Sequence, residues 1–129
     1  MIVDASVVVE YLARGTGAQD ARRVMELGGL AAPHLLDAEA GHALRAHARS
    51  GLLDPGDAEM AVDDLAQMRI ERVGHGSLLG RAWALRDNLS FYDALYIALA
   101  ERLDAPLITF DARLAAAPGH AAEVVLLSA

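Results

Sequence analysis

Two short apolar runs near opposite ends of the chain share one layout: a strand-like run, an aspartate and then a helical pattern. The first is Met1-Ile2-Val3-Asp4, and the second is Leu107-Ile108-Thr109-Phe110-Asp111. Strands that alternate with helices are joined by crossover connections, which build a parallel sheet covered by helices on both faces. This layout therefore places the chain in the α/β class.

The segments between these two runs continue the alternation. Further strands are expected at 30–33, 70–73 and 124–127, and helices at 7–12, 20–27, 35–50, 55–68, 78–88 and 91–103, with a short one ending at 116. With 129 residues, of which 54% are hydrophobic, the chain can bury one core of ordinary size. We expect residues 1–129 to form a single three-layer α/β/α domain with a central parallel sheet of about four or five strands.

Residue types that the chain lacks exclude several classes of function. Without cysteine there is no disulfide framework, thiolate metal site or cysteine nucleophile, and without lysine there is no lysine-based mechanism. No G-x-x-x-x-G-K motif occurs, and Gly15-x-Gly17 follows a helical pattern rather than a strand, so a nucleotide cofactor is not expected. The N-terminus has no basic leader and no stretch is long enough to span a bilayer, so we expect a cytoplasmic protein without a membrane partner.

The net charge of −7 argues against a passive nucleic-acid binder, which usually has a basic surface. A metal-dependent nuclease is a different case, because it concentrates carboxylates around cations. If divalent cations neutralise four carboxylates, the effective charge falls to about −3. The charge therefore weakens a nuclease hypothesis without excluding it.

Four acids are the candidate site. Asp4 and Asp111 follow predicted strands, so they are expected at one edge of the sheet, where α/β proteins bind ligands. Glu39 lies on an apolar helical stripe, and Asp93 lies in the first turn of a mostly apolar helix, three residues after Ser90. Carboxylates gathered without histidine or cysteine are the ligand set of Mg²⁺ or Mn²⁺.

Each acid also has a structural interpretation. Asp4 and Asp111 could cap the helices that follow them, and Asp93 could form a capping box with Ser90. Glu39 could pair with an arginine of its own helix, Arg45 or Arg49. The functional case is joint, because independent caps do not require a glutamate that faces the core.

The same segments resemble the motifs of PIN-domain ribonucleases along essentially the full chain. Ile2-Val3-Asp4-Ala5-Ser6 resembles the opening strand with its D-x-S, and the helix after Pro33 resembles the one that carries the family's glutamate. The stretch from Tyr92 to Ala100 is similar to the most distinctive family motif, and Thr109-Phe110-Asp111 matches T-x-D. Four matches in order identify the chain as a PIN-domain member, most similar to the VapC toxins of VapBC toxin–antitoxin pairs.

The resemblance implies a mechanism and partners. It implies an Mg²⁺- or Mn²⁺-dependent endoribonuclease that cleaves tRNA or ribosomal RNA, pairs with a VapB-type antitoxin and forms a homodimer. Asp4 and Asp93 would hold the metal, and Glu39 and Asp111 would complete the cluster and orient or deprotonate the attacking water. The hydroxyls that aim the carboxylates of Asp4 and Asp111 would be Ser6 and Thr109. Many members carry a further acid three residues after the last aspartate, where this chain has Leu114, so a complete second metal position is not implied.

Other polar and aromatic residues are assigned outside the site. His42 follows Glu39 with Glu-x-x-His spacing, but di-iron sites need a second copy of that motif, so His42 is expected to be packed or exposed. The aromatic residues of apolar helices are expected in the core, namely Trp83, Tyr92 and Tyr96. The arginines that could contact phosphate are Arg81, Arg86 and Arg113.

Three other functional classes fit the same element order. A receiver-like regulatory domain also places acids at strand ends, but that family needs a lysine that this chain lacks. An aspartate-nucleophile phosphatase would carry D-x-D, whereas this chain has Ser6 at the third position. A non-catalytic interaction domain is the remaining alternative if the acids are only caps.

Overall fold

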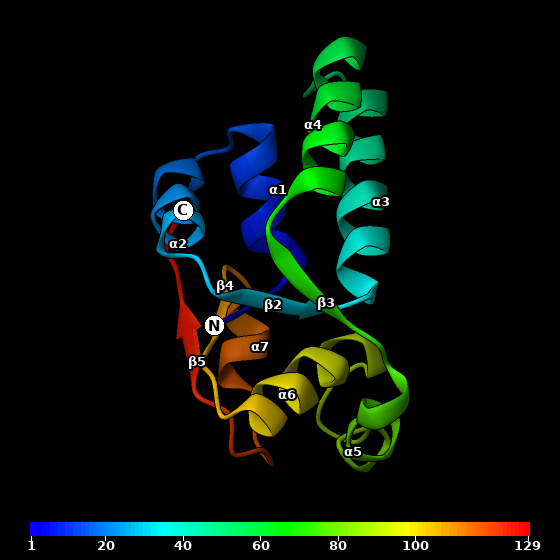
Figure 1. Cartoon of the computed structure of the whole chain (residues 1–129), viewed down its shortest axis with the longest axis vertical. Coiled ribbons are helices and arrows are strands. Elements are labelled where there is room, and N and C mark those ends of the chain that lie inside the picture. Colours follow the sequence, from blue (N-terminus) through cyan, green and yellow to red (C-terminus); the bar gives the residue numbers. More distant parts are fainter.

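A five-stranded parallel sheet forms the centre of the protein in the computed structural model, which describes residues 1–129 (Figure 1). The strands have the order β3-β2-β1-β4-β5. Their bounds are β1 Ile2–Val3, β2 Leu30–Pro33, β3 Ile70–Val73, β4 Leu107–Thr109 and β5 Val124–Leu126. Ile2 of β1 pairs with Ala31 of β2 on one side and with Leu107 of β4 on the other. The predicted α/β class and parallel sheet are confirmed.

Helices cover both faces of this sheet. In Figure 1, α1, α3 and α4 lie above the sheet, and α5 and α6 lie below it. The helices are α1 Ala5–Ala13, α2 Ala18–Leu27, α3 Leu35–Ser50, α4 Pro55–Gln67, α5 Leu79–Ala84, α6 Phe91–Leu103 and α7 Ala112–Ala116, with a 3₁₀ turn at Gly76–Leu78. None of them is both long and apolar enough to cross a membrane.

Several helix ends follow from local sequence. The side chain of Asp54 caps α4 by accepting from the backbone N–H of Gly56, with Pro55 in the first turn, where no intrahelical N–H bond is lost. Ser90 caps α6 by accepting from the backbone N–H of Asp93 over 3.1 Å. Gly51 ends α3 at a φ of 84°, a left-handed conformation that favours glycine.

The predicted helix over 78–88 is wrong in its extent. The α5 helix ends at Ala84, and the following residues form turns in which Leu85, Arg86 and Asn88 donate their backbone N–H groups three residues back. Asp87 and Asn88 are short polar residues that favour turns over helix interiors. The tighter turns let the chain reverse, so that α5 packs against α6.

The core lies on both faces of the sheet and surrounds α6. Every residue from Ala94 to Ala100 is buried, so the middle of α6 is enclosed on all sides. Only two buried residues are polar or charged, and these are Asp4 and Thr109. Because burying polar groups costs free energy unless they are hydrogen-bonded, these two residues mark the place where the fold departs from an apolar core.

Candidate active site

Asp4 is the most deeply buried acid and lies directly after β1, with 8% of its surface exposed. It caps α1 by accepting from the backbone N–H of Ser6 over 3.1 Å, so the capping interpretation is correct for its Oδ1 atom. The same Oδ1 also accepts from the hydroxyl of Ser6, and Oδ2 accepts from the hydroxyl of Thr109 over 2.6 Å. A helix cap needs only one oxygen, so these further contacts hold the whole carboxylate in one orientation.

The two hydroxyls belong to a network that links β1 to β4. The Ser6 Oγ atom accepts from the backbone N–H of Phe110 over 3.0 Å, and Thr109 Oγ1 accepts from the backbone N–H of Asp111 over 2.9 Å. The prediction that Ser6 and Thr109 aim Asp4 agrees with these contacts. For Asp111 the contact is different, because Thr109 binds its backbone and not its carboxylate.

Asp111 lies two residues beyond β4, next to Asp4 at the same edge of the sheet, because β1 and β4 are neighbouring parallel strands. Its side chain caps α7 by accepting from the backbone N–H of Arg113 over 2.9 Å. The Arg113 guanidinium also lies 3.4 Å from Asp111 Oδ2, although its side chain is 90% exposed. Asp111 therefore combines a helix cap with a place in the acid cluster.

Glu39 enters the site from the second turn of α3, which follows β2 at the same edge of the sheet. Its Oε1 atom accepts a hydrogen bond of 2.7 Å from the phenolic hydroxyl of Tyr96 on α6. Neither Arg45 nor Arg49 forms an ion pair with it, so the structural interpretation of Glu39 is wrong. Burial raises the pKa of Glu39, the Tyr96 bond opposes that rise, and the charges of Asp93 and Asp4 add to it.

Asp93 lies in the first turn of α6, half-buried, where its backbone N–H donates to Ser90. Burial raises the pKa of Asp93, and the negative charge of Asp111 raises it further, whereas the Ser90 hydrogen bond and the Arg113 charge lower it. Burial also raises the pKa of Asp4, against hydrogen bonds from Ser6 and Thr109. These mutual effects connect the four predicted acids into one electrostatic cluster.

This cluster is loose rather than a closed cage. No three acidic or histidine side chains converge as the ligands of a single metal ion. Mg²⁺ commonly keeps several waters and binds through only one or two carboxylates, so a loose set of oxygen donors fits that ion. The donor chemistry suits a hard divalent cation, since the carboxylates raise one another's pKa and no lysine is present to neutralise them.

Comparison with known proteins decides the family. Residues 1–119 match the sequence model of the PIN domain. The chain is 46% identical to ribonuclease VapC1 of Mycobacterium tuberculosis over 98% of its own length and 96% of that protein. The chain belongs to the PIN domain family. Its relatives place it with the VapC proteins of that family, which also include ribonuclease VapC3 of the same organism, 40% identical over 91% of this chain and 86% of that protein.

Solved structures support the same assignment at the level of fold. A crystal structure of PAE2754 from Pyrobaculum aerophilum matches this PIN domain with a TM-score of 0.66 and 28% identity, over 89% of this chain and 76% of that one. VapC20 of Mycobacterium tuberculosis, described as a sarcin-ricin loop cleaving toxin, matches with a TM-score of 0.68 and 17% identity, over 89% of this chain and 92% of that one. The fold is therefore that of a VapC-type PIN domain rather than that of a receiver-like domain.

The aromatic residues of this PIN domain do not lie where the sequence predicted. Trp83 and Tyr92 are each 61% exposed, so their predicted place in the core is wrong, whereas Tyr96 is 1% exposed as expected. Trp83 lies near the end of α5 and Tyr92 near the start of α6. Tyr96 was left out of the predicted site, although its spacing of three residues from Asp93 puts both on one side of α6.

Two of the arginines assigned to phosphate contact have structural partners instead. Arg81 forms a two-bond ion pair with Glu101 in the C-terminal half of α6, at 2.7 Å and 3.0 Å. The Arg86 guanidinium lies over the Trp83 ring, 4.7 Å from its centroid. Of the three, Arg113 is the one that lies beside the acids, so only Arg113 keeps its predicted place near the site.

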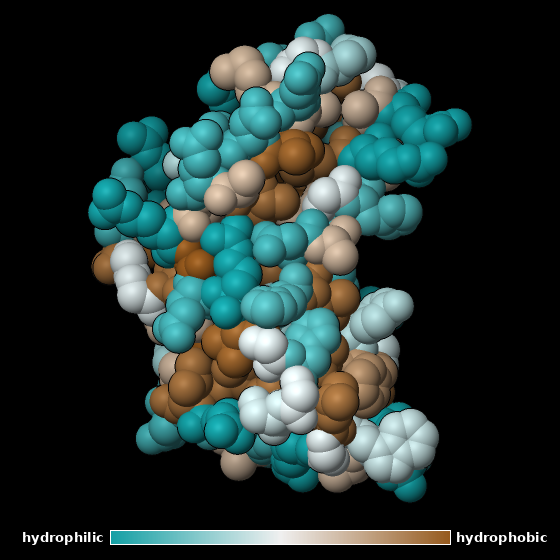
Figure 2. Space-filling model, turned by 45° about the vertical axis from the view of Figure 1, so that its right-hand side comes forward, coloured by the Kyte–Doolittle hydropathy of each residue, from teal (hydrophilic) through white to brown (hydrophobic).

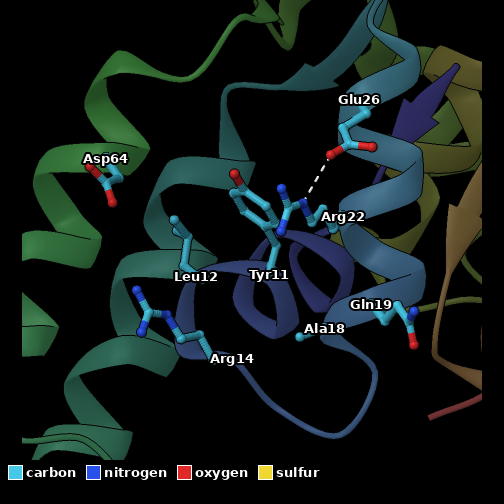
Figure 3. A pocket seen from close by; sticks show the side chains of 8 residues that line it. All are labelled: Tyr11, Leu12, Arg14, Ala18, Gln19, Arg22, Glu26 and Asp64. Atoms are coloured by element: carbon cyan, nitrogen blue, oxygen red, sulfur yellow. Dashed lines mark hydrogen bonds and ion pairs between the residues drawn. The ribbon is translucent and has the colours of Figure 1, made fainter.

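A hollow of the PIN domain with a volume of about 580 Å³ lies elsewhere, between α1, α2 and α4. Figure 3 shows Tyr11, Arg14 and Arg22 extending from the α1 and α2 side, with Asp64 facing them from α4. None of the four site acids lines it. The acid cluster is therefore better identified by its chemistry than by the size of a cavity.

Proposed function

We propose that this PIN domain is a metal-dependent endoribonuclease and the toxin of a type II toxin–antitoxin module. The observation that carries the proposal is Asp4, a buried carboxylate held by two hydroxyls. Glu39 lies near enough to Asp4 that, after burial and the charge of Asp93, the charge of Asp4 also raises the pKa of Glu39. A purely structural acid does not need this arrangement. The ribonuclease names of relatives up to 46% identical point to the same chemistry.

The proposed cofactor is Mg²⁺, for which Mn²⁺ can substitute. Asp4 and Asp93 would hold it, because their carboxylates are set at the edge of the sheet by different elements and are free of ion pairs with arginine. When bound, such a cation supplies positive charge to the reacting phosphate and to the attacking water. Leu114 is apolar and fully buried, so it provides no further oxygen ligand.

The protein's own residues orient the reacting groups. Ser6 and Thr109 hold Asp4 through their hydroxyls, and Tyr96 holds Glu39 by donating its phenolic hydroxyl to Oε1. The raised pKa of Glu39 makes this carboxylate a better proton acceptor than an exposed glutamate. Glu39 is accordingly the candidate to accept a proton from the attacking water, and Asp111 completes the cluster on the side of Asp93.

The proposed partners are RNA and an antitoxin. A toxin–antitoxin complex from Klebsiella pneumoniae has this fold, with a TM-score of 0.61 and 18% identity over 89% of both chains. VapBC2 from Rickettsia felis has it too, with a TM-score of 0.64 and 13% identity over 95% of this chain and 96% of that one. By analogy we propose a VapB-type antitoxin that covers the acid cluster with an arginine, and a homodimer of the toxin. The RNA substrate is proposed to be tRNA or ribosomal RNA.

Cleavage by the purified protein tests the proposal. We expect it to cut tRNA or ribosomal RNA with Mg²⁺ or Mn²⁺, to stop in EDTA, and to arrest growth when expressed without its antitoxin. Intact RNA at high enzyme concentration with either metal, for both RNA classes, would overturn the ribonuclease assignment.

A further inference from the structure

The exposed face of α3 carries two arginines that follow Glu39 along the helix. Arg45 and Arg49 lie four residues apart, which places them on one side of the helix, with His42 three residues before Arg45 on the same side. All three side chains are exposed. The cationic row consists of Arg45 and Arg49, and it ends about 15 Å along the helix from Glu39.

Neither arginine of the row has an acidic partner. Five of the chain's arginines form ion pairs, but Arg45 and Arg49 are not among them. The neighbouring helix α4 carries four acids, yet none of their carboxylates forms an ion pair with the row; they are Asp57, Glu59, Asp63 and Asp64. In a chain with a net charge of −7, two adjacent unpaired arginines form a local reversal of charge.

The helix dipole accounts for only part of this row. Cations stabilise the last turn of a helix, which explains Arg49 near the end of α3. Arg45 lies a full turn earlier, beyond the range of that effect. The row therefore needs another reason to be cationic.

The position of α3 connects the row to the acids. The helix begins at the edge of the sheet where the strands end, and it rises away from that edge next to α4 (Figure 1). Figure 2 shows the molecule hollowed on its right-hand side, with strongly hydrophilic residues above the hollow in the part that α3 occupies. The cationic row therefore lies along a helix that leads away from the edge of the sheet where the acids are.

We infer that the cationic row on α3 binds backbone phosphates of the RNA substrate on one side of the cleavage point. This inference rests on the proposed ribonuclease function. Arginine binds phosphate through a planar fork, and two forks one turn apart fit a polyanion rather than a single small anion. The row holds RNA near the cluster despite the repulsion between phosphates and acids, and because it contacts no base it contributes affinity rather than sequence preference.

The test measures RNA binding by the full chain in an Asp93→Asn background, which should bind RNA without cutting it. Fluorescence anisotropy with a labelled single-stranded RNA of mixed sequence compares that protein with one that also carries Arg45→Gln and Arg49→Gln. We expect about tenfold weaker binding and a salt dependence that is shallower by about 1.4 in the slope of log K against log salt, since each phosphate contact with a single strand contributes about 0.7.

A matched control removes two unpaired, exposed arginines from the opposite edge of the sheet, with Arg69→Gln and Arg102→Gln. Arg69 precedes β3 and Arg102 lies in the last turn of α6, so both are far from the ends of the strands that carry the acids. This control should leave the affinity and the salt slope unchanged. An equal loss in both double variants would overturn the inference, because it would mean that only total charge matters.

The outcomes separate this inference from the proposed function. If the wild-type protein cuts RNA but the α3 variant binds with unchanged affinity and slope, the cationic row is not a phosphate site and the ribonuclease assignment stands. If the α3 variant no longer binds the antitoxin but binds RNA with unchanged affinity, the row is a protein interface and the inference is wrong. If the wild-type protein neither binds nor cuts RNA, the proposed function itself fails.

Discussion

The phenolic hydroxyl of Tyr96 donates a hydrogen bond of 2.7 Å to Oε1 of Glu39 and so joins α6 to α3 across the acid cluster. Tyr96 is 1% exposed, and its pKa is raised by burial and by the charge of Glu39, so the hydroxyl stays protonated and donates. Because the two residues lie 57 positions apart, this contact ties together distant parts of the chain. It fixes the direction of Glu39, whose carboxylate accepts no hydrogen bond from a backbone N–H.

Tyr96→Phe removes that hydroxyl and little else. We expect the free energy of unfolding to fall by about 1–2 kcal/mol, since one charged hydrogen bond is lost. RNA cleavage should fall by about tenfold or more through kcat, with KM little changed, because Glu39 becomes free to rotate. The matched control is Tyr92→Phe, whose hydroxyl is exposed and makes no hydrogen bond within the protein. Unchanged kcat in Tyr96→Phe would contradict a positioning role.

Thr109→Val tests how Asp4 is held. The substitution keeps the shape of the side chain but leaves the buried Asp4 Oδ2 without its hydroxyl donor. An unsatisfied buried acceptor costs about 1–3 kcal/mol, which urea or thermal unfolding can measure. Thr16→Val is the control, because Thr16 is exposed and should tolerate the change. Equal stability of the two variants would mean that the hydroxyl of Thr109 does not support Asp4.

The proposed metal site predicts a shift in thermal stability. Mn²⁺ should raise the melting temperature of the wild-type protein relative to EDTA, because a ligand that binds only the folded state stabilises it. Asp93→Asn should remove most of that shift while preserving its place in the first turn of α6, since asparagine and aspartate behave similarly near helix starts. An Mn²⁺ shift of wild-type size in Asp93→Asn would take Asp93 out of the metal site.

The raised pKa of Asp93 predicts how stability without metal depends on pH. An acid whose pKa is raised by folding stabilises the protein below its ordinary pKa, and this contribution is lost as the pH rises through the raised value. In EDTA at about pH 7, Asp93→Asn should therefore be as stable as the wild type or more stable. The advantage should shrink as the pH falls toward about 4, where the wild-type carboxyl is protonated.

The stability contribution of Glu101 should depend on pH in the opposite direction to that of Asp93. Its pKa is lowered, mainly by the hydrogen bond from Arg81, so its contribution is present above the ordinary pKa and is lost as the pH falls. Glu101→Gln should be less stable than the wild type at about pH 7, and the difference should diminish in acid. Unfolding curves of both variants at the two pH values measure this contrast. If acid changed the stability of both variants relative to the wild type in the same direction, the electrostatic description of these two acids would be contradicted.

The order of elements and the four acids could be predicted from the sequence because these signals are local. Alternating strand and helix patterns specify a parallel sheet, and acids placed just after strands must meet at one edge of it. The bounds of α3 and the cap at Ser90 likewise depend on neighbouring residues, and the structure confirms them. The early end of α5 was missed, since the reversal toward α6 depends on packing between helices.

Contacts between distant segments were decided only by the tertiary structure. The local pattern places Trp83, Tyr92 and Tyr96 on similar apolar helices, yet only Tyr96 faces the core. The partner of Glu39 is likewise a residue of another helix, and the unpaired state of Arg45 and Arg49 depends on which acids the fold brings near them. Sequence spacing determines which residues share a face of one element, but the packing of elements against each other determines what that face meets.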